Sequence, residues 1–170
     1  MKKIDIPDAS RFDRNGLLKE VLSQFRISKN GVHGPNHWAR VRHHGLEIGS
    51  HVGADLLVVE LFAFLHDSQR VDEYEDRHHG ERAAEYAVSL NQRYFDLTPA
   101  GLDDLTHAIR LHSEGDVHQN STIQSCWDAD RLDIGRVGIK PSAKYLSMLA
   151  AQRIEDAYKW SRQRDFSPSV

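Results

Sequence analysis

The amino-acid sequence predicts an all-α domain of about six or seven helices, with no sheet beyond incidental pairing. Apolar residues recur at helical spacing along most of the chain, which is typical of helices that pack one face against a core. Residues that start or stop helices lie between these stretches, among them Pro35, Gly53, Asp55 and Pro99. Their positions divide the chain into helices joined by short loops.

The length and the net charge of the chain limit the class of protein that it can be. A chain of 170 residues with 39% hydrophobic content suffices for one domain with a substantial core, so we expect a single domain over residues 1–170. The 22 Lys and Arg side chains against 25 Asp and Glu give a net charge of -3. No global positive field therefore recruits nucleic acid or an anionic membrane, and an anionic substrate must be held locally.

Cysteine content and apolar runs bear on metal chemistry and location. Cys126 is the single cysteine of the sequence, which excludes an intramolecular disulfide and any zinc site built from several cysteines. Metal ligands must then be His, Asp or Glu. The first residues carry no apolar signal segment, and the longest apolar run, 56–65, is interrupted by Glu60 and is too short for a bilayer. We expect a cytoplasmic protein without a membrane span.

The first part of the chain predicts two helices. Residues 13–28 place apolar side chains on one face and are expected to pack on the core. Pro35 suits the first position of a second helix that runs to about Val52, and Gly53 follows as a C-cap.

Four of the histidines in and beside this second helix are considered separately. His37 lies in its first turn, four residues before Val41, so its ring can point inward beside the apolar face. His33 precedes the helix in a turn. His43 and His44 lie among charged residues, and we expect both to be solvated.

An apolar helix followed by metal-capable side chains dominates the middle of the chain. Asp55 is its expected N-cap, and its apolar residues follow helical spacing. It should end at His66 and Asp67, which are followed by Arg70. A histidine and an aspartate also end helices for purely local reasons, so the other segments must decide between a cap and a ligand pair.

Two predicted helices after this point each have a histidine at one end. A charged loop, 71–78, comes first and could form a lid. The following helix, 79–94, begins with His79. The next, 99–111, has Thr98 as its N-cap and ends at His112.

The last third of the chain predicts two more helices. One, 122–134, holds Asp128 and Asp130 among apolar residues, where a buried carboxylate needs a cation. The other, 144–162, belongs to a C-terminal segment, 141–163, that should cover the core.

The order of these residues resembles the His...His-Asp...Asp pattern of the HD superfamily of metal-dependent phosphohydrolases. The resemblance covers roughly residues 30–140 and implies the helical bundle of that family. Four segments in the right order make the match specific. The segments similar to the family's signatures are His37-Trp-Ala-Arg-Val, Leu65-His-Asp-Ser, Ala108-Ile-Arg-Leu-His-Ser and Asp128-Ala-Asp-Arg-Leu-Asp.

The resemblance implies one or two metal ions. The ligands of the first would be His37, His66, Asp67 and Asp130. The segment that begins at His79 resembles two-metal members, in which this histidine and one matching His112 hold a second ion, and Asp67 could bridge the two. Mixed nitrogen and oxygen ligation suits Mn, Fe, Co, Ni or Zn, with Mg as a further candidate. The chain lacks a Gly-Tyr-Pro signature after His112, which argues against cyclic dinucleotide hydrolysis.

Other side chains are candidates for phosphate binding and proton transfer. Arg70 can clamp a phosphate with its planar guanidinium group. Further arginine candidates for substrate binding, each also a typical surface or ion-pair residue, are Arg40, Arg82 and Arg131. The catalytic candidates are Asp67, His33 and Asp128. The acid that protonates the leaving group stays open between His33, Asp128 and Glu114.

We therefore predict a metal-dependent phosphohydrolase that uses a metal-activated water on a phosphomonoester or phosphodiester, with a nucleotide or a related small phosphorylated metabolite as its substrate. Two other classes use the same ligands: a non-catalytic regulatory domain with a structural ion, and a metal-dependent lyase or oxygenase. We expect neither membrane nor specific nucleic-acid binding, and a homodimer is compatible with the sequence.

Overall fold

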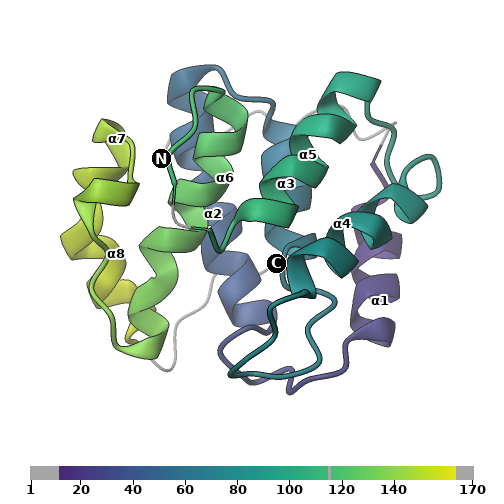
Figure 1. Cartoon of the computed structure of the whole chain (residues 1–170), viewed down its shortest axis with the longest axis horizontal. Coiled ribbons are helices and arrows are strands. Elements are labelled where there is room, and N and C mark those ends of the chain that lie inside the picture. The colour runs from purple at the N-terminus through teal and green to yellow at the C-terminus, as the bar shows by residue number, and fades with distance from the viewer. Residues whose placement is uncertain (1–11, 115, 164–170) are drawn as a thin grey trace.

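The structure, a computed structural model, describes residues 12–114 and 116–163. Over this part of the chain the protein is built from helices. Residues 1–11, 115 and 164–170 of the predicted domain lie outside this part. Within it there are eight α-helices, two 3-10 helices and two isolated bridges, without any strand. The predicted all-α class is confirmed (Figure 1). The helices are α1 (Arg14–Gln24), α2 (Pro35–Val52), α3 (Leu56–Leu65), α4 (His79–Leu90), α5 (Pro99–Leu111), α6 (Ser121–Leu132), η2 (Asp133–Val137), η3 (Ala143–Tyr145), α7 (Met148–Ala151) and α8 (Ile154–Ser161).

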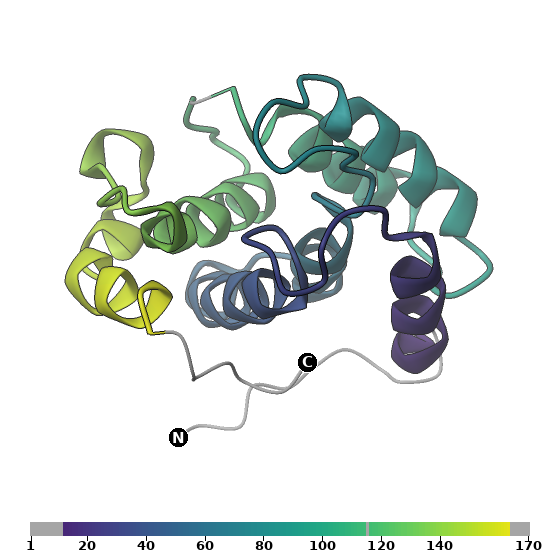
Figure 2. The ribbon, with the colours of Figure 1, turned by 90° about the horizontal axis from the view of Figure 1, so that it is seen from below.

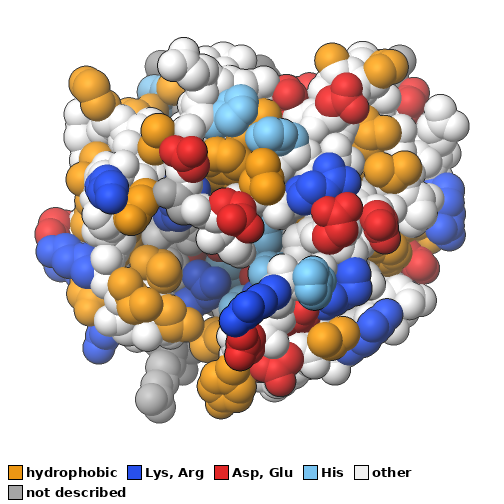
Figure 3. Space-filling model, viewed as in Figure 1, with side chains coloured by type: hydrophobic (Ala, Val, Ile, Leu, Met, Phe, Trp, Pro, Cys, Tyr) orange, Lys and Arg blue, Asp and Glu red, His pale blue; other side chains and the backbone are white. Residues whose placement is uncertain are grey.

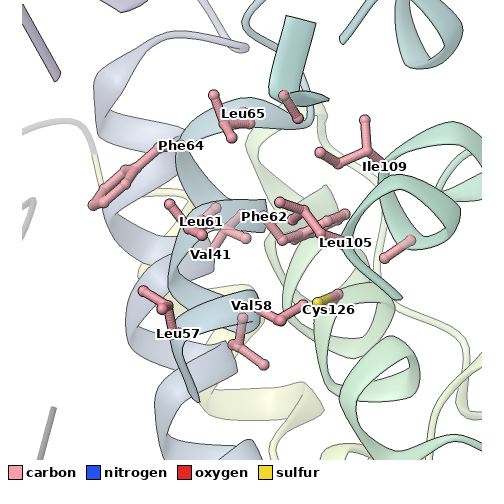
Figure 4. Packing of buried hydrophobic residues seen from close by; sticks show 14 of the residues in the cluster. Val41, Leu57, Val58, Leu61, Phe62, Phe64, Leu65, Leu105, Ile109 and Cys126 are labelled. Carbon is pink, nitrogen blue, oxygen red and sulfur yellow. The ribbon is translucent and has the colours of Figure 1, made fainter. Parts of the chain in front are cut away.

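Helices α2, α3 and α6 pack against one another at the centre of the bundle. Figures 1 and 2 show the pair α4 and α5 on one side of this centre and α7 with α8 on the other, while α1 lies at the end far from α8. Helix α3 is apolar on all sides, which is the pattern of a helix surrounded by protein. Figure 4 shows its side chains packed against α2, α5 and α6, with Phe62 next to Leu105.

Glu60 is the polar exception on α3. Its carboxylate is fully buried, and it accepts hydrogen bonds from Arg14 of α1 at 2.9 Å and from Arg42 of α2 at 2.6 Å. A buried carboxylate is tolerated when cations pair with it. These contacts therefore connect α1 and α2 to the central helix.

The predicted starts of α3 and α5 and the predicted end of α2 are confirmed. Asp55 caps α3, because its Oδ1 accepts from the backbone N–H groups of Leu57 and Val58. Thr98 caps α5 in the same way. Gly53 ends α2 with a φ of 70°, a left-handed conformation that favours glycine.

Three predicted helix ends were placed too late. Helix α1 ends at Gln24 rather than near residue 28, α6 ends at Leu132, and α4 ends at Leu90 instead of Tyr94. After α4 the chain turns, because Asn91 is extended and its Oδ1 accepts from the N–H of Leu97. Such side-chain bonds to the backbone compete with helix continuation.

The single helix predicted over 144–162 was wrong. This stretch contains η3, α7 and α8. Ser147 explains the break, because its hydroxyl accepts from Ala150 N–H as the cap of α7 and donates to the carboxylate of Asp128. A serine used as a cap starts a new helix at that point. None of the described helices is long and apolar enough to cross a membrane.

Candidate metal centre and active site

Six histidine and aspartate side chains from five helices converge at one place. His37 comes from the first turn of α2, and Asp130 from α6. His66 and Asp67 follow α3, where His66 is the C-cap. His79 begins α4, and His112 is the C-cap of α5. Figure 3 shows histidine and Lys or Arg side chains at the bottom of a hollow on this face. The structure therefore brings together all the residues that the sequence named as ligands.

The first group of donor atoms consists of His37, His66 and Asp130. The Nε2 atoms of His37 and His66 lie 3.0 Å apart. Asp130 Oδ1 lies 3.3 Å from His37 Nε2 and 3.6 Å from His66 Nε2. Ligands about 2.1 Å from an ion lie about 3.0 Å apart at right angles and about 3.4 Å apart at tetrahedral angles. The group therefore has the spacing of ligands around one ion.

The second group consists of His79 and His112, with Asp67 between the two groups. The Nε2 atoms of His79 and His112 are 3.0 Å apart. Asp67 Oδ1 lies 3.4 Å from His79 Nε2 and 3.6 Å from His112 Nε2. Its other oxygen, Oδ2, lies 3.4 Å from His37 Nε2 and 3.3 Å from His66 Nε2. One carboxylate thus faces both histidine pairs, as a bridging ligand would.

The other ring nitrogen of each histidine has an acceptor. The Nδ1–H of His37 donates to the carboxylate of Asp133 at 2.7 Å. The Nδ1–H groups of His66, His79 and His112 donate to backbone carbonyl oxygens, those of Phe62, Asp76 and Ile109. These bonds leave the lone pair of each neutral ring on Nε2. All four lone pairs therefore point into the cluster.

This arrangement fits a metal ion. Two Nε2 lone pairs cannot face each other at 3.0 Å without a cation between them, either a proton or a metal ion. Asp67 Oδ1 and Asp130 Oδ1 are buried and have no hydrogen-bond partner within the described structure. Unpartnered buried carboxylate oxygens are costly unless a cation satisfies them. The buried His/Asp groups could thus hold metal ions.

The electrostatics show the same demand for positive charge. Burial lowers the pKa of His66, but Asp67 and Asp130 outweigh it and raise that pKa to about 10. Burial raises the pKa of Asp67, but His66, His112 and His37 together bring it well below its usual range. The cluster therefore attracts cations, and a divalent ion would compete with protons for the same nitrogen atoms.

Gly80 allows the second histidine pair to form. A Cβ atom on Gly80 would lie 2.9 Å from the carbonyl oxygens of both Ile109 and Arg110, so α4 packs directly on the backbone of α5. His79 immediately precedes Gly80, and His112 follows α5. The close approach of the two backbones thus sets the separation of the two imidazoles.

Sequence reasoning missed Asp133. It is fully buried at the start of η2 and binds His37 through Oδ2 and Arg40 through both oxygens. Asp133 follows Asp130 by three residues, so the two carboxylates share one side of the helix. The run Asp130-Arg-Leu-Asp133 could have revealed this role. It places the candidate ligand Asp130 and the hydrogen-bond partner of the ligand His37 on adjacent turns.

A pocket of about 340 Å³ opens onto the cluster. Asp67, Asp130 and His112 form part of its wall. Its cations are Arg70, Arg131 and Arg136. The sequence predicted Arg70 and Arg131 as substrate-binding candidates but not Arg136. Arg136 lies after Asp133 on η2, and no sequence pattern marked it as a pocket residue.

Backbone carbonyl groups hold these three arginines. Arg70 donates to the carbonyl of Asp72, Arg131 to that of Tyr145, and Arg136 to those of Val32 and Asp133. Within the described ranges, the carboxylates that lie within 4.0 Å of these guanidinium groups are the candidate ligands Asp67 and Asp130. If an ion occupies the cluster, the three positive charges stay available for an anion in the pocket.

The other two predicted substrate arginines lie elsewhere. Arg40 forms a buried ion pair with Asp133, with Nε 2.6 Å from Oδ1. Arg82 binds Asp76 at 2.6 Å and the carbonyl of Gln69. Protein carboxylates neutralise the charges of both arginines. Arg40 and Arg82 are therefore ion-pair residues rather than substrate-binding residues of this pocket.

The three candidate acids differ in their surroundings. His33 lines the pocket, and its Nδ1 lies 2.6 Å from Glu73 Oε2 of the 71–78 loop. Asp128 is fully buried, but it accepts from Gln124, from Ser147 N–H and from the Ser147 hydroxyl, and it does not line the pocket. Glu114 is exposed and also does not line it. The geometry favours His33.

A solved structure shares this fold. No family model and no curated protein matches the chain. The structure is similar to the crystal structure of a predicted HD superfamily hydrolase from an uncultured Thermotogales bacterium, with a TM-score of 0.66. The two sequences are 27% identical, and the match covers 88% of this chain and 87% of that one. The chain has an HD-domain-like fold.

The HD-like assignment agrees with the cluster. His37, His66 and Asp130 form one group of potential metal ligands, and His66, Asp67 and His112 form another, with the donor atoms of each group within 4.8 Å of one another. The HD resemblance predicted from the sequence is confirmed in fold, and the His/Asp cluster is consistent with an HD site.

Proposed function

We propose that this HD-like domain is a metal-dependent phosphohydrolase that acts on a small phosphorylated metabolite such as a nucleotide. The observation that supports it is the set of three carbonyl-held arginines, Arg70, Arg131 and Arg136, around a pocket that opens on the His/Asp cluster. Guanidinium groups bind phosphate oxygens with paired, charge-assisted hydrogen bonds. A structural ion would need no such surroundings.

The reaction that we propose is the attack of water on phosphorus, with cleavage of the bond between phosphorus and the leaving oxygen. The residues that would hold the ions are His37, His66, Asp67, Asp130, His79 and His112. A divalent ion there lowers the pKa of water and neutralises charge on a phosphoryl group. Arg70 and Arg136 lie within 4.0 Å of Asp67 and Asp130, respectively, so they can orient the phosphoryl oxygens beside the cluster.

His33 is the side chain that we assign to the leaving group. Glu73 holds its Nδ1, which leaves Nε2 for a second contact. Burial lowers the pKa of His33, which makes its protonated form a stronger acid than a free histidine. The proton on Nε2 would pass to the leaving oxygen as the bond to phosphorus breaks, and the proton that the attacking water releases would restore the protonated form of His33 through solvent.

A metal-reconstituted activity screen tests this proposal. The purified protein is stripped of metal, reloaded separately with Mn, Fe, Co, Ni, Zn or Mg, and assayed for phosphate release and product formation with nucleotides, dinucleoside polyphosphates and simple phosphodiesters. We expect turnover only with metal, and its loss in Asp67→Asn and His66→Ala. His51→Ala, at an exposed position outside the cluster, is the control. Stoichiometric metal binding without turnover of any phosphate ester would instead support a regulatory domain.

A further inference from the structure

A second cavity, of about 450 Å³, lies between α2 and the α7–α8 segment. It shares no lining residue with the pocket beside the His/Asp cluster. Its wall consists of His43, His44, Leu149, Gln152, Arg153, Asp156, Ala157 and Trp160. Ligand pockets in proteins typically have volumes of about 300 to 1,000 Å³, so the cavity has the size of a small-molecule site.

Two nitrogen atoms at this cavity have no hydrogen-bond partner among the described residues. His44, which sequence reasoning expected to be solvated, is only 5% exposed, and its Nε2 atom is buried without a hydrogen bond to any described residue. The same holds for Nε of Arg153, although Nη2 of that residue donates to Glu47 at 2.8 Å. Buried polar atoms are normally satisfied. Both unsatisfied atoms belong to residues that line the cavity, where a ligand could supply the missing partners.

The cavity also has an aromatic wall. The Trp160 ring centroid lies 5.0 Å from that of His43 and 5.1 Å from that of His44, and the interplanar angles are 83° and 71°. Leu149 and Ala157 add apolar surface. Such a wall favours a flat ligand, because the faces of rings stack with little loss of conformational freedom.

The charges around the cavity disfavour an anion. Glu47 already neutralises Arg153, and Asp156 adds a negative charge. Burial lowers the pKa of His44 to about 4 and also lowers that of His43, so both rings are neutral near pH 7. A phosphate group would find no unpaired cation among the described lining residues.

From these observations we propose that the cavity binds an uncharged, planar nitrogen heterocycle, such as a nucleobase or its nucleoside, stacked on Trp160 and hydrogen-bonded to His44 and Arg153. A ring nitrogen of the ligand would accept from Arg153 Nε–H, and a neighbouring exocyclic amino group would donate to His44 Nε2. Heterocycles of this class carry such donors and acceptors side by side on one edge, and they have the flat faces that the wall requires.

An NMR titration of the full chain tests the site without any assay of activity. Adenosine is the probe, and ribose 5-phosphate, which has a phosphate but no base, is the matched comparison. We expect adenosine to shift the amide resonances of α8 and of His43 and His44, with a Kd of about 1 mM or tighter. Ribose 5-phosphate should leave these resonances unchanged.

Variants then assign the site. Trp160→Leu should weaken adenosine binding at least tenfold, and Lys159→Ala, at an exposed neighbouring position that does not line the cavity, should not change it. Gln152→Trp, which fills the cavity from an exposed position, should also block binding and covers the case in which Trp160→Leu does not fold. Shifts confined to the His/Asp pocket, no shifts at all, or full affinity in both variants would overturn the proposal.

Discussion

His37 donates its Nδ1–H to Asp133 across 2.7 Å, and Asp133 is held in turn by Arg40 through both carboxylate oxygens. This chain of contacts joins the first turn of α2 to η2 and fixes the ring of His37, so that Nε2 faces His66. The carboxylate also raises the electron density of the imidazole, which strengthens it as a metal ligand.

The first prediction is that Asp133→Asn weakens metal binding by about tenfold to a hundredfold, because a neutral amide holds the ring less firmly and polarises it less. Metal titration of the stripped protein measures this. The substitution also leaves Arg40 buried without its carboxylate partner. A second variant, Asp133→Asn combined with Arg40→Met, therefore leaves no buried charge without a partner. Asp103→Asn, at an exposed position, is the control. Wild-type affinity in both Asp133 variants would contradict the proposed role.

The second prediction concerns the number of ions. His79→Ala and His112→Ala should each remove one of two metal equivalents and most of the turnover, because these imidazoles face Oδ1 of Asp67, whereas His37 and His66 face its Oδ2. Elemental analysis of wild type and variants at matched folding measures the equivalents. One metal equivalent in wild type and in both variants would exclude the two-ion mechanism. The mechanism would then use a single ion, with His112 or Arg70 as a phosphate contact.

The third prediction is that Gly80→Ala destabilises the fold by about 1 to 3 kcal/mol, because the added methyl group meets two backbone carbonyl oxygens of α5 and α4 must move away. The movement should also separate His79 from His112 and weaken the second ion. Thermal unfolding and metal analysis report the two effects. Gly101→Ala is a matched control on α5, because its nearest contact is an ordinary 3.4 Å. Equal melting temperatures and equal metal content in Gly80→Ala and Gly101→Ala would contradict this explanation.

The fourth prediction separates pocket arginines from structural ones. Arg136→Met and Arg131→Met should each raise KM for a phosphorylated substrate by about tenfold to a hundredfold, the effect of losing a hydrogen bond to a charged group. Steady-state kinetics with the substrate found in the screen measure this. Arg110→Met, which removes an exposed cation paired with Glu81, should leave KM unchanged. An unchanged KM in both pocket variants would remove these arginines from the substrate site.

The fifth prediction concerns pH and His44, whose pKa burial lowers to about 4 from 6.5. The unfolded chain binds a proton at this residue below pH 6.5, whereas the folded chain does so only near pH 4. Stability is therefore lost as the pH falls through this range, by up to about 3 kcal/mol, since each pKa unit corresponds to about 1.4 kcal/mol. Chemical denaturation of wild type and His44→Leu across the range measures it. The variant should lose less stability on acidification, and parallel losses would refute the assignment.

Local sequence signals determined most helix starts and the candidate ligands. Asp55, Thr98 and Pro35 mark helix starts through bonds and conformations that involve neighbouring residues only, so they can be recognised without a fold. His66 and Asp67 were recognisable because an apolar helix ends there. The helix ends after Leu90 and before Met148 could not be predicted, because they depend on side-chain bonds such as that between Ser147 and Asp128.

Tertiary structure alone decided the roles of residues that look alike in the sequence. Arg40 and Arg136 are both arginines near candidate ligands, but Asp133 neutralises the first, whereas backbone carbonyl groups hold the second beside the pocket. Similarly, His43 is exposed and the adjacent His44 is buried. A charged or titratable group acquires its function from the partners that packing brings to it, and those partners come from distant parts of the chain.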